Sequence, residues 1–313
     1  MNNRDLLLGI FVMIIWGLNF SVIKLGVGEI DPLLLTALRF TFAVIPAVFF
    51  VKRPQVKWRF LIGYGLVFAI GVWGMGSWSI QAGLSAGMAS VLLQMNVVIS
   101  LLVGYFLLKE TVAPMKVIGS VIAILGLALS VSVTDGSVTT LGLLFILIAA
   151  SSWSITSIIV KKAATKEVFA FSIWGMLFAP LPLFALAFLR AGPEQLQALN
   201  SLANGAVIFS VLFQAYPVTL FGYWVWNRLL VKYPLSTAAP LTFLVPIFGL
   251  LGSAIFYQEQ IGLVKALACL LIIVGLIIGL LKTEKFKTYF KETQQPTEQQ
   301  TRYGEEKIAQ TQK

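Results

Sequence analysis

The sequence predicts an all-α polytopic membrane protein with ten transmembrane helices arranged as two inverted five-helix repeats. Three observations lead to this class. Hydrophobic residues make up 58% of the chain and charged residues only 12%, about half the charge of a soluble domain. Apolar runs of about 20 residues, long enough to cross a bilayer, recur along the chain. Finally, the first half of the sequence matches the second.

The internal match is clearest in two nine-residue stretches, WGLNFSVIK at 16–24 and WSITSIIVK at 153–161. Their Trp residues lie 137 positions apart, and an offset of 149 places Glu110 on Glu259. The expected units are residues 1–134 and 135–281, followed by a tail at 282–313. Because five spans is an odd number, the second unit must cross the membrane in the opposite orientation. Inverted repeats of this kind are typical of transporters.

In the first unit, the opening span carries the repeated stretch and the second begins at Pro32. The third is rich in Trp, the fourth contains two amides, and the fifth begins after Pro114. Pro and Gly punctuate most span ends, as turns require. The five spans cover residues 6–25, 32–51, 60–80, 86–108 and 115–133.

In the second unit, the sixth span carries the repeated stretch again and the seventh is interrupted by Pro180 and Pro182. The eighth is rich in Tyr and Trp, the ninth contains AAPLTFLVP, and the tenth holds the single cysteine, Cys269. We interpret Cys269 as inert packing. These spans cover residues 140–160, 168–189, 206–227, 235–257 and 262–281.

The Lys and Arg residues predict the orientation. Nineteen of the 23 lie at the N-terminus, in alternate loops or in the tail, whereas Arg190 and Lys265 lie on the opposite side. Both termini are therefore expected in the cytoplasm of a multi-pass cell-membrane protein. The first apolar run has no small-residue cleavage site, so we expect a retained helix rather than a signal peptide.

Several function classes are excluded. The net charge of +10 reflects topology rather than a nucleic-acid surface, because the basic residues lie between apolar runs and in the tail. The chain has no His and one Cys, so we expect no metal site, no cofactor and no enzyme activity of the Ser-His-Asp type. A Walker-type phosphate loop is also missing.

The Gln-rich tail is expected to be dispensable, with a basic start lying on the inner membrane surface.

Ten residues are candidates for contacting a substrate, because polar and aromatic groups at membrane depth often line transport pathways. Asn19 follows Trp16 by one turn, so both can face one cavity; the alternative for Asn19 is an interhelical hydrogen bond. Trp73 and Trp224 lie deeper than the residues expected in an interfacial belt. The candidates are Trp16, Asn19, Arg39, Trp73, Gln94, Asn96, Trp153, Thr156, Tyr223 and Trp224.

Two cations within spans leave alternatives open. Arg39 lies about two turns into its span, where a guanidinium needs an aqueous cavity or a carboxylate. We favour the cavity, while Glu29 and Asp31 are alternative partners from the preceding loop. For Lys24, snorkelling to the outer interface is the simpler interpretation.

At WGLNFSVIK, the LRF of residues 38–40 and the AAPLTFLVP of residues 238–246, the sequence resembles the EamA family of the drug/metabolite transporter superfamily. The resemblance covers about residues 5–281. It implies ten helices in two inverted repeats, a central cavity and efflux of small metabolites. It also implies cavity roles for Trp16, Asn19, Arg39, Trp153 and Pro240, although the second repeat has Thr156 where the first has Asn19.

The leading hypothesis is therefore export of small amino-acid metabolites of the O-acetylserine and cysteine kind by alternating access. Multidrug efflux of lipophilic cations is the alternative, weakened because no membrane carboxylate attracts the cation. A lipid flippase and a membrane scaffold are further alternatives from other classes. The expected partners are a small-molecule substrate and the lipid bilayer, and a homodimer is compatible with the sequence.

The sequence also bears on the energy source. Coupling to protons normally requires Asp, Glu or His within the membrane. The chain has no His, and all 13 carboxylates lie in loops, at span ends or in the tail. We therefore expect downhill export along the gradient of the substrate.

Overall fold

The computed structural model describes residues 1–109, 112–192, 204–233 and 238–281, and these residues are helical with no strand among them. The expected tail at 282–313 lies outside the described residues. The helices are α1 (Asn3–Val27), α2 (Pro32–Phe50), α3 (Trp58–Leu66), α4 (Met75–Gln81), α5 (Ala86–Leu92), α6 (Asn96–Leu108), α7 (Pro114–Ser130), α8 (Thr140–Ala163), α9 (Val168–Met176), α10 (Pro180–Ala191), α12 (Gly205–Phe213), α13 (Gly222–Lys232), α15 (Leu244–Tyr257) and α16 (Leu263–Leu280).

Eight helical stretches in this part of the chain are long and apolar enough to span a membrane, several of them built from consecutive labelled helices. Two shorter apolar helices cover Pro114–Ser130 and Leu241–Tyr257. A multi-pass membrane protein is therefore confirmed, whereas the count of ten spans stays a prediction. Large apolar side chains such as Phe50, Leu181 and Leu189 are more than three-quarters exposed, as expected for a surface that contacts lipid.

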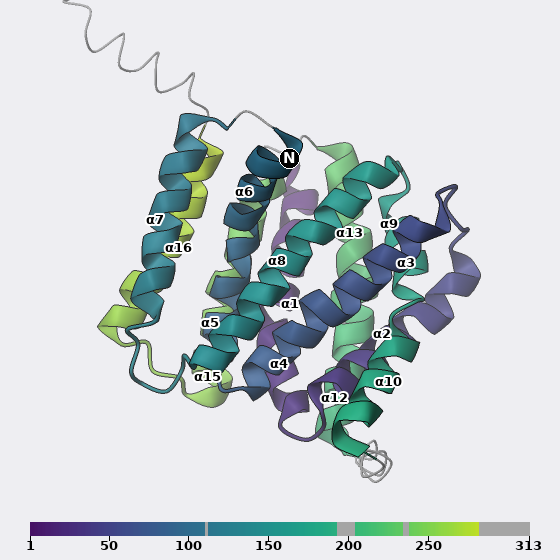
Figure 1. The fold of residues 1–313 in the computed structure, drawn as a ribbon, viewed down its shortest axis with the longest axis horizontal. Helices are drawn as coiled ribbons and strands as arrows, with labels where there is room; N and C mark the ends of the chain where they lie inside the picture. Colours follow the sequence, from purple (N-terminus) through teal and green to yellow (C-terminus); the bar gives the residue numbers. More distant parts are fainter. Residues whose placement is uncertain (110–111, 193–203, 234–237, 282–313) are drawn as a thin grey trace, which may run out of the picture.

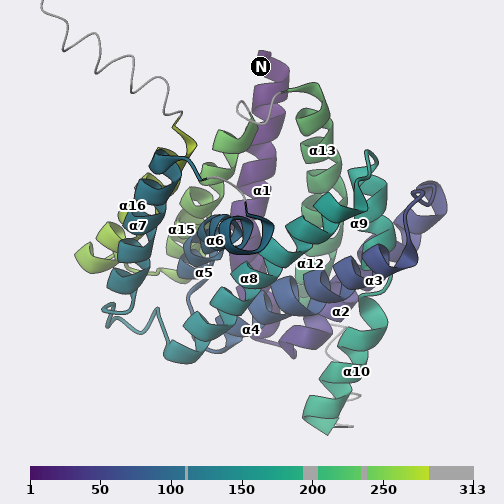
Figure 2. The same ribbon diagram turned by 45° about the horizontal axis from the view of Figure 1, so that its top comes forward.

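The first helix lies at the centre of the bundle. It packs against α15 and α5 on one side and α12 and α13 on the other, and Figure 2 shows it between α15 and α13. The beginning of α1 and the end of α16 lie at the same end of the bundle (Figure 1). The loop at 135–137, which joins α7 to α8, lies at the opposite end.

The sequence explains where the second helix begins. Asp31 caps α2, because its carboxylate accepts hydrogen bonds from the backbone N–H groups of Leu33 and Leu34 at 2.8 and 3.2 Å. Pro32 occupies the first turn, where its missing N–H costs nothing. A similar break occurs between α9 and α10, where Pro180 is the first residue of α10.

Within the described ranges, four irregular segments interrupt the helices at matching places in the two halves. Two are π-helical, η1 (Val67–Gly74) and η5 (Gln214–Phe221). Two are 3-10 segments, η2 (Leu93–Met95) and η6 (Ala239–Phe243). Pro217 lies inside η5 and removes a backbone donor there. Each irregular segment changes the direction of the side chains that follow it.

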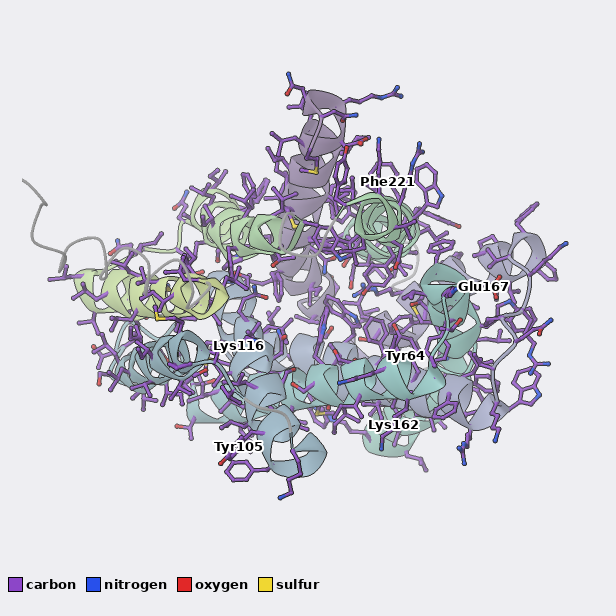
Figure 3. The ribbon with its side chains drawn as sticks, turned by 90° about the horizontal axis from the view of Figure 1, so that it is seen from above. Tyr64, Tyr105, Lys116, Lys162, Glu167 and Phe221 are labelled. Carbon is purple, nitrogen blue, oxygen red and sulfur yellow. The ribbon has the colours of Figure 1, made fainter. Side chains whose placement is uncertain are left out.

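The pair α7 and α16 stands at one edge of the bundle (Figure 3), and glycines allow its backbones to meet. A Cβ atom added at Gly275 would lie 2.5 Å from the carbonyl oxygen of Gly119 and 2.6 Å from the backbone nitrogen of Ala123. Neither backbone atom can move without separating the helices. Small residues at such crossings are a common means of helix association in membranes.

Replacing Gly275 with alanine is therefore expected to destabilise the protein by about 1–3 kcal/mol, the usual cost of overpacking. The matched control is Gly205→Ala, where an added Cβ meets nothing within 4 Å and alanine favours the helix. Thermal unfolding of the two purified variants checks the prediction. Equal melting temperatures would show that α7 and α16 are not held in this close contact.

Candidate functional site

A central cavity of about 100 Å³ lies between the two halves of the chain. All four irregular segments contribute to its wall, together with α1, α6, α8, α13 and α15. The lining residues are Trp16, Asn19, Phe20, Trp73, Leu93, Gln94, Asn96, Trp153, Val218, Tyr223, Thr242 and Val245. Seven of the ten residues expected from the sequence are thus brought together here.

Helix α1 places Trp16 and Asn19 on one wall, as their spacing predicts. The indole N–H of Trp16 donates to the carbonyl oxygen of Val218 at 3.1 Å, which fixes the ring against η5. Asn19 is fully buried, and neither its amide nitrogen nor its amide oxygen has a hydrogen-bond partner among the described residues. A buried amide without partners costs free energy, and a ligand that hydrogen-bonds to Asn19 would remove that cost.

Aromatic rings form most of the remaining wall. The ring of Trp153, from α8, meets that of Trp73, from η1, with centroids 6.0 Å apart. Tyr223, from α13, packs edge-on against Trp16 at 5.6 Å. Phe68 lies behind them and contacts Trp73, Trp153 and Tyr223. Apart from the tilted pair of Phe68 and Tyr223, these contacts are edge-to-face, the geometry that aromatic quadrupoles favour.

Two of these aromatic residues also present polar atoms. The indole N–H of Trp73 and the hydroxyl of Tyr223 are buried neighbours that form no hydrogen bond of good geometry. The amide nitrogen of Asn96 instead donates to the carbonyl oxygen of Leu93 at 2.7 Å, so it is bound to its own helix. The cavity therefore offers unsatisfied donors at Asn19, Trp73 and Tyr223.

Arg39 lies one layer outside the cavity, behind Trp73. Its guanidinium is fully buried and lies over the Trp73 ring at 4.0 Å from the centroid, a cation–π contact. It donates to the hydroxyl of Thr219 at 3.1 and 3.2 Å and to the side-chain carbonyl of Gln214 at 3.4 Å. No carboxylate among the described residues lies within 4 Å of it.

The alternative loop partners of Arg39 are engaged elsewhere. Asp31 pairs with Arg190 at 2.5 Å, and Glu29 accepts a hydrogen bond from Asn204 at 2.8 Å. Arg39 is thus a buried positive charge without an acidic partner in the described chain, which normally costs several kcal/mol. Such a charge within a membrane-spanning segment makes Arg39 a candidate functional residue.

Besides Arg39, two expected residues lie off the cavity. Thr156 is buried, but its hydroxyl donates to the carbonyl oxygen of Trp153 at 2.7 Å. Trp224 is 49% exposed. Its ring centroid lies 5.8 Å from the guanidinium carbon of Arg228, on the outside of the helix bundle. Consecutive residues on a helix point about 100° apart, so Trp224 cannot share the direction of Tyr223.

Five lining residues are not among the ten selected candidates: Phe20, Leu93, Val218, Thr242 and Val245. Thr242 is a polar residue within an apolar run, so a signal for it exists in the sequence. The other four are apolar residues in apolar helices and carry no such signal. Three of the five lie in irregular segments, whose side-chain directions do not follow the ordinary helical period.

The arrangement can bind a small polar molecule that carries both charges. The donors of Asn19, Trp73 and Tyr223 suit a carboxylate, and the positive field of Arg39 reaches it through the Trp73 ring. The faces of Trp and Tyr attract an ammonium group. None of the lining residues is an Asp, Glu or His, so the cavity lacks a side chain that titrates near neutral pH.

Known proteins match over most of the chain. The model of the EamA-like transporter family matches residues 4–132 and 140–281. A probable amino-acid metabolite efflux pump of Escherichia coli is 32% identical over 285 residues, covering 89% of this chain and 95% of that protein. The protein of the same description from Salmonella typhimurium gives the same identity and coverage.

More distant proteins extend the comparison. An uncharacterized transporter of Archaeoglobus fulgidus is 26% identical over 273 residues, covering 84% of this chain and 94% of that protein. A crystal structure aligns with a TM-score of 0.58 at 20% sequence identity, covering 89% of this chain and 96% of that chain. At this identity the structural match shows a shared fold and nothing more.

Proposed function

The chain belongs to the EamA-like transporter family and is a membrane transporter, and from that premise we propose that it exports small zwitterionic amino-acid metabolites through the central cavity. The observation that carries the proposal is Asn19, a fully buried amide without hydrogen-bond partners in the wall of that cavity. The relatives of this chain in Escherichia coli and Salmonella typhimurium are described as probable amino-acid metabolite efflux pumps.

The size of the cavity supports a small substrate. At about 100 Å³ it is well below the roughly 300–1,000 Å³ of pockets for drug-sized ligands. The alternative, efflux of lipophilic cations, is disfavoured because the wall contains no carboxylate and Arg39 places a positive charge behind it. The substrates we propose are of the O-acetylserine and cysteine kind, with the carboxylate towards Asn19 and Trp73.

We propose that the transporter works by alternating access between two inverted five-helix units, residues 1–134 and 135–281. The recurrence of a π-helical segment and a 3-10 segment at matching places in both halves supports this. The two stretches that match the family model support it as well. All four irregular segments line the cavity, where discontinuous helices of inverted-repeat transporters hold their substrates.

The proposed orientation places both termini in the cytoplasm of the cell membrane. Nineteen of the 23 basic residues lie on the expected inner side, and the two ends of the described helical bundle lie together (Figure 1). A reporter active only outside the cell, fused after residue 135, is expected to be active. The same reporter fused after residue 300 is expected to be inactive. Equal activity of both fusions would contradict the ten-span topology.

Metabolite profiling of the growth medium tests the substrate class. Cells that overproduce the protein are expected to release more O-acetylserine and cysteine than cells with an empty vector. Cells producing Asn19→Leu at the same membrane level serve as the control for the cavity. Resistance to lipophilic dyes without any release of amino-acid metabolites would favour the alternative.

A further inference from the structure

A second cavity, of about 380 Å³, lies at the end of the bundle opposite the N-terminus. It is formed where the end of α1 meets three connections, α4 to α5, α7 to α8 and α15 to α16. We call it the vestibule. Its lining residues are Lys24, Ile80, Gly83, Leu84, Ser85, Asp135, Gly136, Ser137, Tyr257, Gln258, Glu259 and Gln260. Unlike the central cavity, it contains charged side chains of both signs.

One wall of the vestibule carries a net negative charge. Lys265, at the start of α16, is only 1% exposed and forms ion pairs with both Glu259 and Asp135, the latter at 3.7 Å. Two carboxylates therefore share one ammonium group, which leaves one negative charge uncompensated. The side chain of Asp135 is 37% exposed, so that charge is accessible from the vestibule.

Both carboxylates are ionised at neutral pH. Burial is the largest single influence on the pKa of Glu259 and raises it, but hydrogen bonds from Lys265 and neighbouring serines together lower it below the ordinary value. Burial likewise opposes the ionisation of Asp135, and hydrogen bonding by Ser137 together with Lys265 lowers its pKa. The negative charge is thus present under physiological conditions.

The vestibule also carries a positive charge that forms no ion pair with a described carboxylate. The ammonium of Lys24 lies 4.2 Å above the centre of the Tyr257 ring, and no carboxylate in the described part of the chain lies within 4 Å of it. The Tyr257 hydroxyl donates to the backbone carbonyl of Ser21 at 2.8 Å, which holds the ring beneath Lys24. This position at the end of the bundle is compatible with the snorkelling expected for Lys24, and it also places the ammonium group in the vestibule wall.

A buried hydroxyl completes the set. Ser137 is 8% exposed, lines the vestibule, and its hydroxyl has no hydrogen bond of good geometry. Its backbone N–H is used, since it donates to the Asp135 carboxylate at 2.8 Å. The Ser137 hydroxyl therefore lies beside the Asp135 carboxylate in the vestibule wall, where a ligand could give it a well-aligned hydrogen bond.

We propose that the vestibule is a second binding site for zwitterionic α-amino acids, with Lys24 facing the carboxylate and the Asp135–Glu259 wall facing the ammonium group. The choice of amino acids rests on the proposed function. Lys24 follows Asn19 by five residues, about 7.5 Å along α1 at the helical rise. The vestibule therefore lies next to the central cavity along the same helix and holds the substrate as it leaves.

A thiol-protection assay tests occupancy of the vestibule directly, without measuring transport. The native chain has one cysteine, and Cys269 is buried. Gln260→Cys introduces an exposed thiol at the vestibule lining, and Ser132→Cys introduces an exposed control thiol outside the lining. The purified full chain is labelled with a maleimide in the presence of O-acetyl-L-serine, of acetate, or of ethanolamine.

O-acetyl-L-serine is expected to slow labelling of the Gln260→Cys variant and to leave the Ser132→Cys variant unchanged. Because acetate and ethanolamine each carry only one of the two charges, they are expected to protect weakly. Adding Lys24→Gln removes a charged hydrogen-bond donor, so half-protection should need at least about tenfold more amino acid. Lys24→Arg keeps the charge and should retain protection, and the exposed control Lys162→Gln should change nothing.

The assay separates this inference from the proposed function. Export by cells without any thiol protection overturns the vestibule site and leaves the transport proposal standing. Protection without export rejects the transport proposal and retains the site. Equal protection by acetate alone, or protection that survives Lys24→Gln unchanged in a folded protein, shows that the vestibule does not recognise a zwitterion.

Discussion

Replacing Arg39 with leucine is expected to abolish export of carboxylate-bearing substrates while the protein still reaches the membrane. The guanidinium is the one positive charge described against the cavity wall, held on the outer face of Trp73 at 4.0 Å from the ring centroid. Its removal takes away the field that favours a carboxylate in the cavity. It also frees the Trp73 ring, which the cation–π contact holds in place.

Arg39→Leu is expected to lose export without becoming less stable. Arg39 is a buried charge without an acidic partner in the described residues, and apolar replacement of buried charged groups is often neutral or stabilising. Thr219 keeps its hydrogen bond to the backbone carbonyl oxygen of Gln214 at 2.7 Å, and the Gln214 amide nitrogen keeps its hydrogen bond to Ser210 at 3.0 Å. Only the long hydrogen bond to the Gln214 side-chain carbonyl, at 3.4 Å, is lost without a replacement. A melting temperature at or above that of the wild type, together with lost export, would identify a functional role rather than a structural one.

Two further variants sharpen the test of Arg39. Arg39→Lys keeps the charge but loses the planar fork that reaches Thr219 and Gln214 together, so it should retain part of the export. The matched control is Arg228→Leu, because Arg228 also lies over a tryptophan ring, that of the exposed Trp224. Normal export by Arg39→Leu would contradict the assignment of the buried charge to substrate binding.

Replacing Asn19 with leucine is expected to lower the rate of export by about tenfold or more, the cost of losing a hydrogen bond to a charged group. The same change should leave the folded protein as stable or more stable, because the wild-type amide is buried without partners. Leucine has nearly the same shape, so the cavity is kept. Initial rates at several substrate concentrations, at matched membrane levels, check the prediction.

The control for Asn19 is Asn227→Leu. The amide of Asn227 donates to the carbonyl oxygen of Tyr223 in its own helix at 2.8 Å, and Asn227 does not line the cavity. Export by this variant should stay near the wild-type rate. If both asparagine variants lower export equally, the effect belongs to polar groups in helices generally and not to the cavity.

The sequence contained most of the helical framework, because apolar length and Pro or Gly breaks are local properties. Pro32 and Pro114 begin α2 and α7 as expected. The spacing of Trp16 and Asn19 also placed both residues on one wall, since α1 is regular along its length. Where a helix is unbroken, local periodicity is sufficient to predict which residues share one face.

Where helices are irregular or satisfy their own polar groups, local patterns were insufficient. Val218 lines the cavity because η5 is π-helical, and no residue type in the sequence predicts a π-helical segment. Thr156 matches Asn19 in the repeat, yet its hydroxyl reaches the backbone of its own helix. The position of Arg39 behind Trp73 depends on contacts with Thr219 and Gln214, about 180 residues away in sequence, which only the folded chain brings together.

The measurement that tests the central claim most directly is efflux from liposomes that contain the purified protein and labelled O-acetyl-L-serine. The cavity lining has no Asp, Glu or His, so we expect efflux along the substrate gradient that persists without an imposed pH difference and is lowered by Asn19→Leu. Efflux no faster than from liposomes that contain the substrate but no protein would contradict transport of this substrate. Uphill accumulation driven by a pH gradient alone would contradict downhill export through a cavity without a titrating side chain.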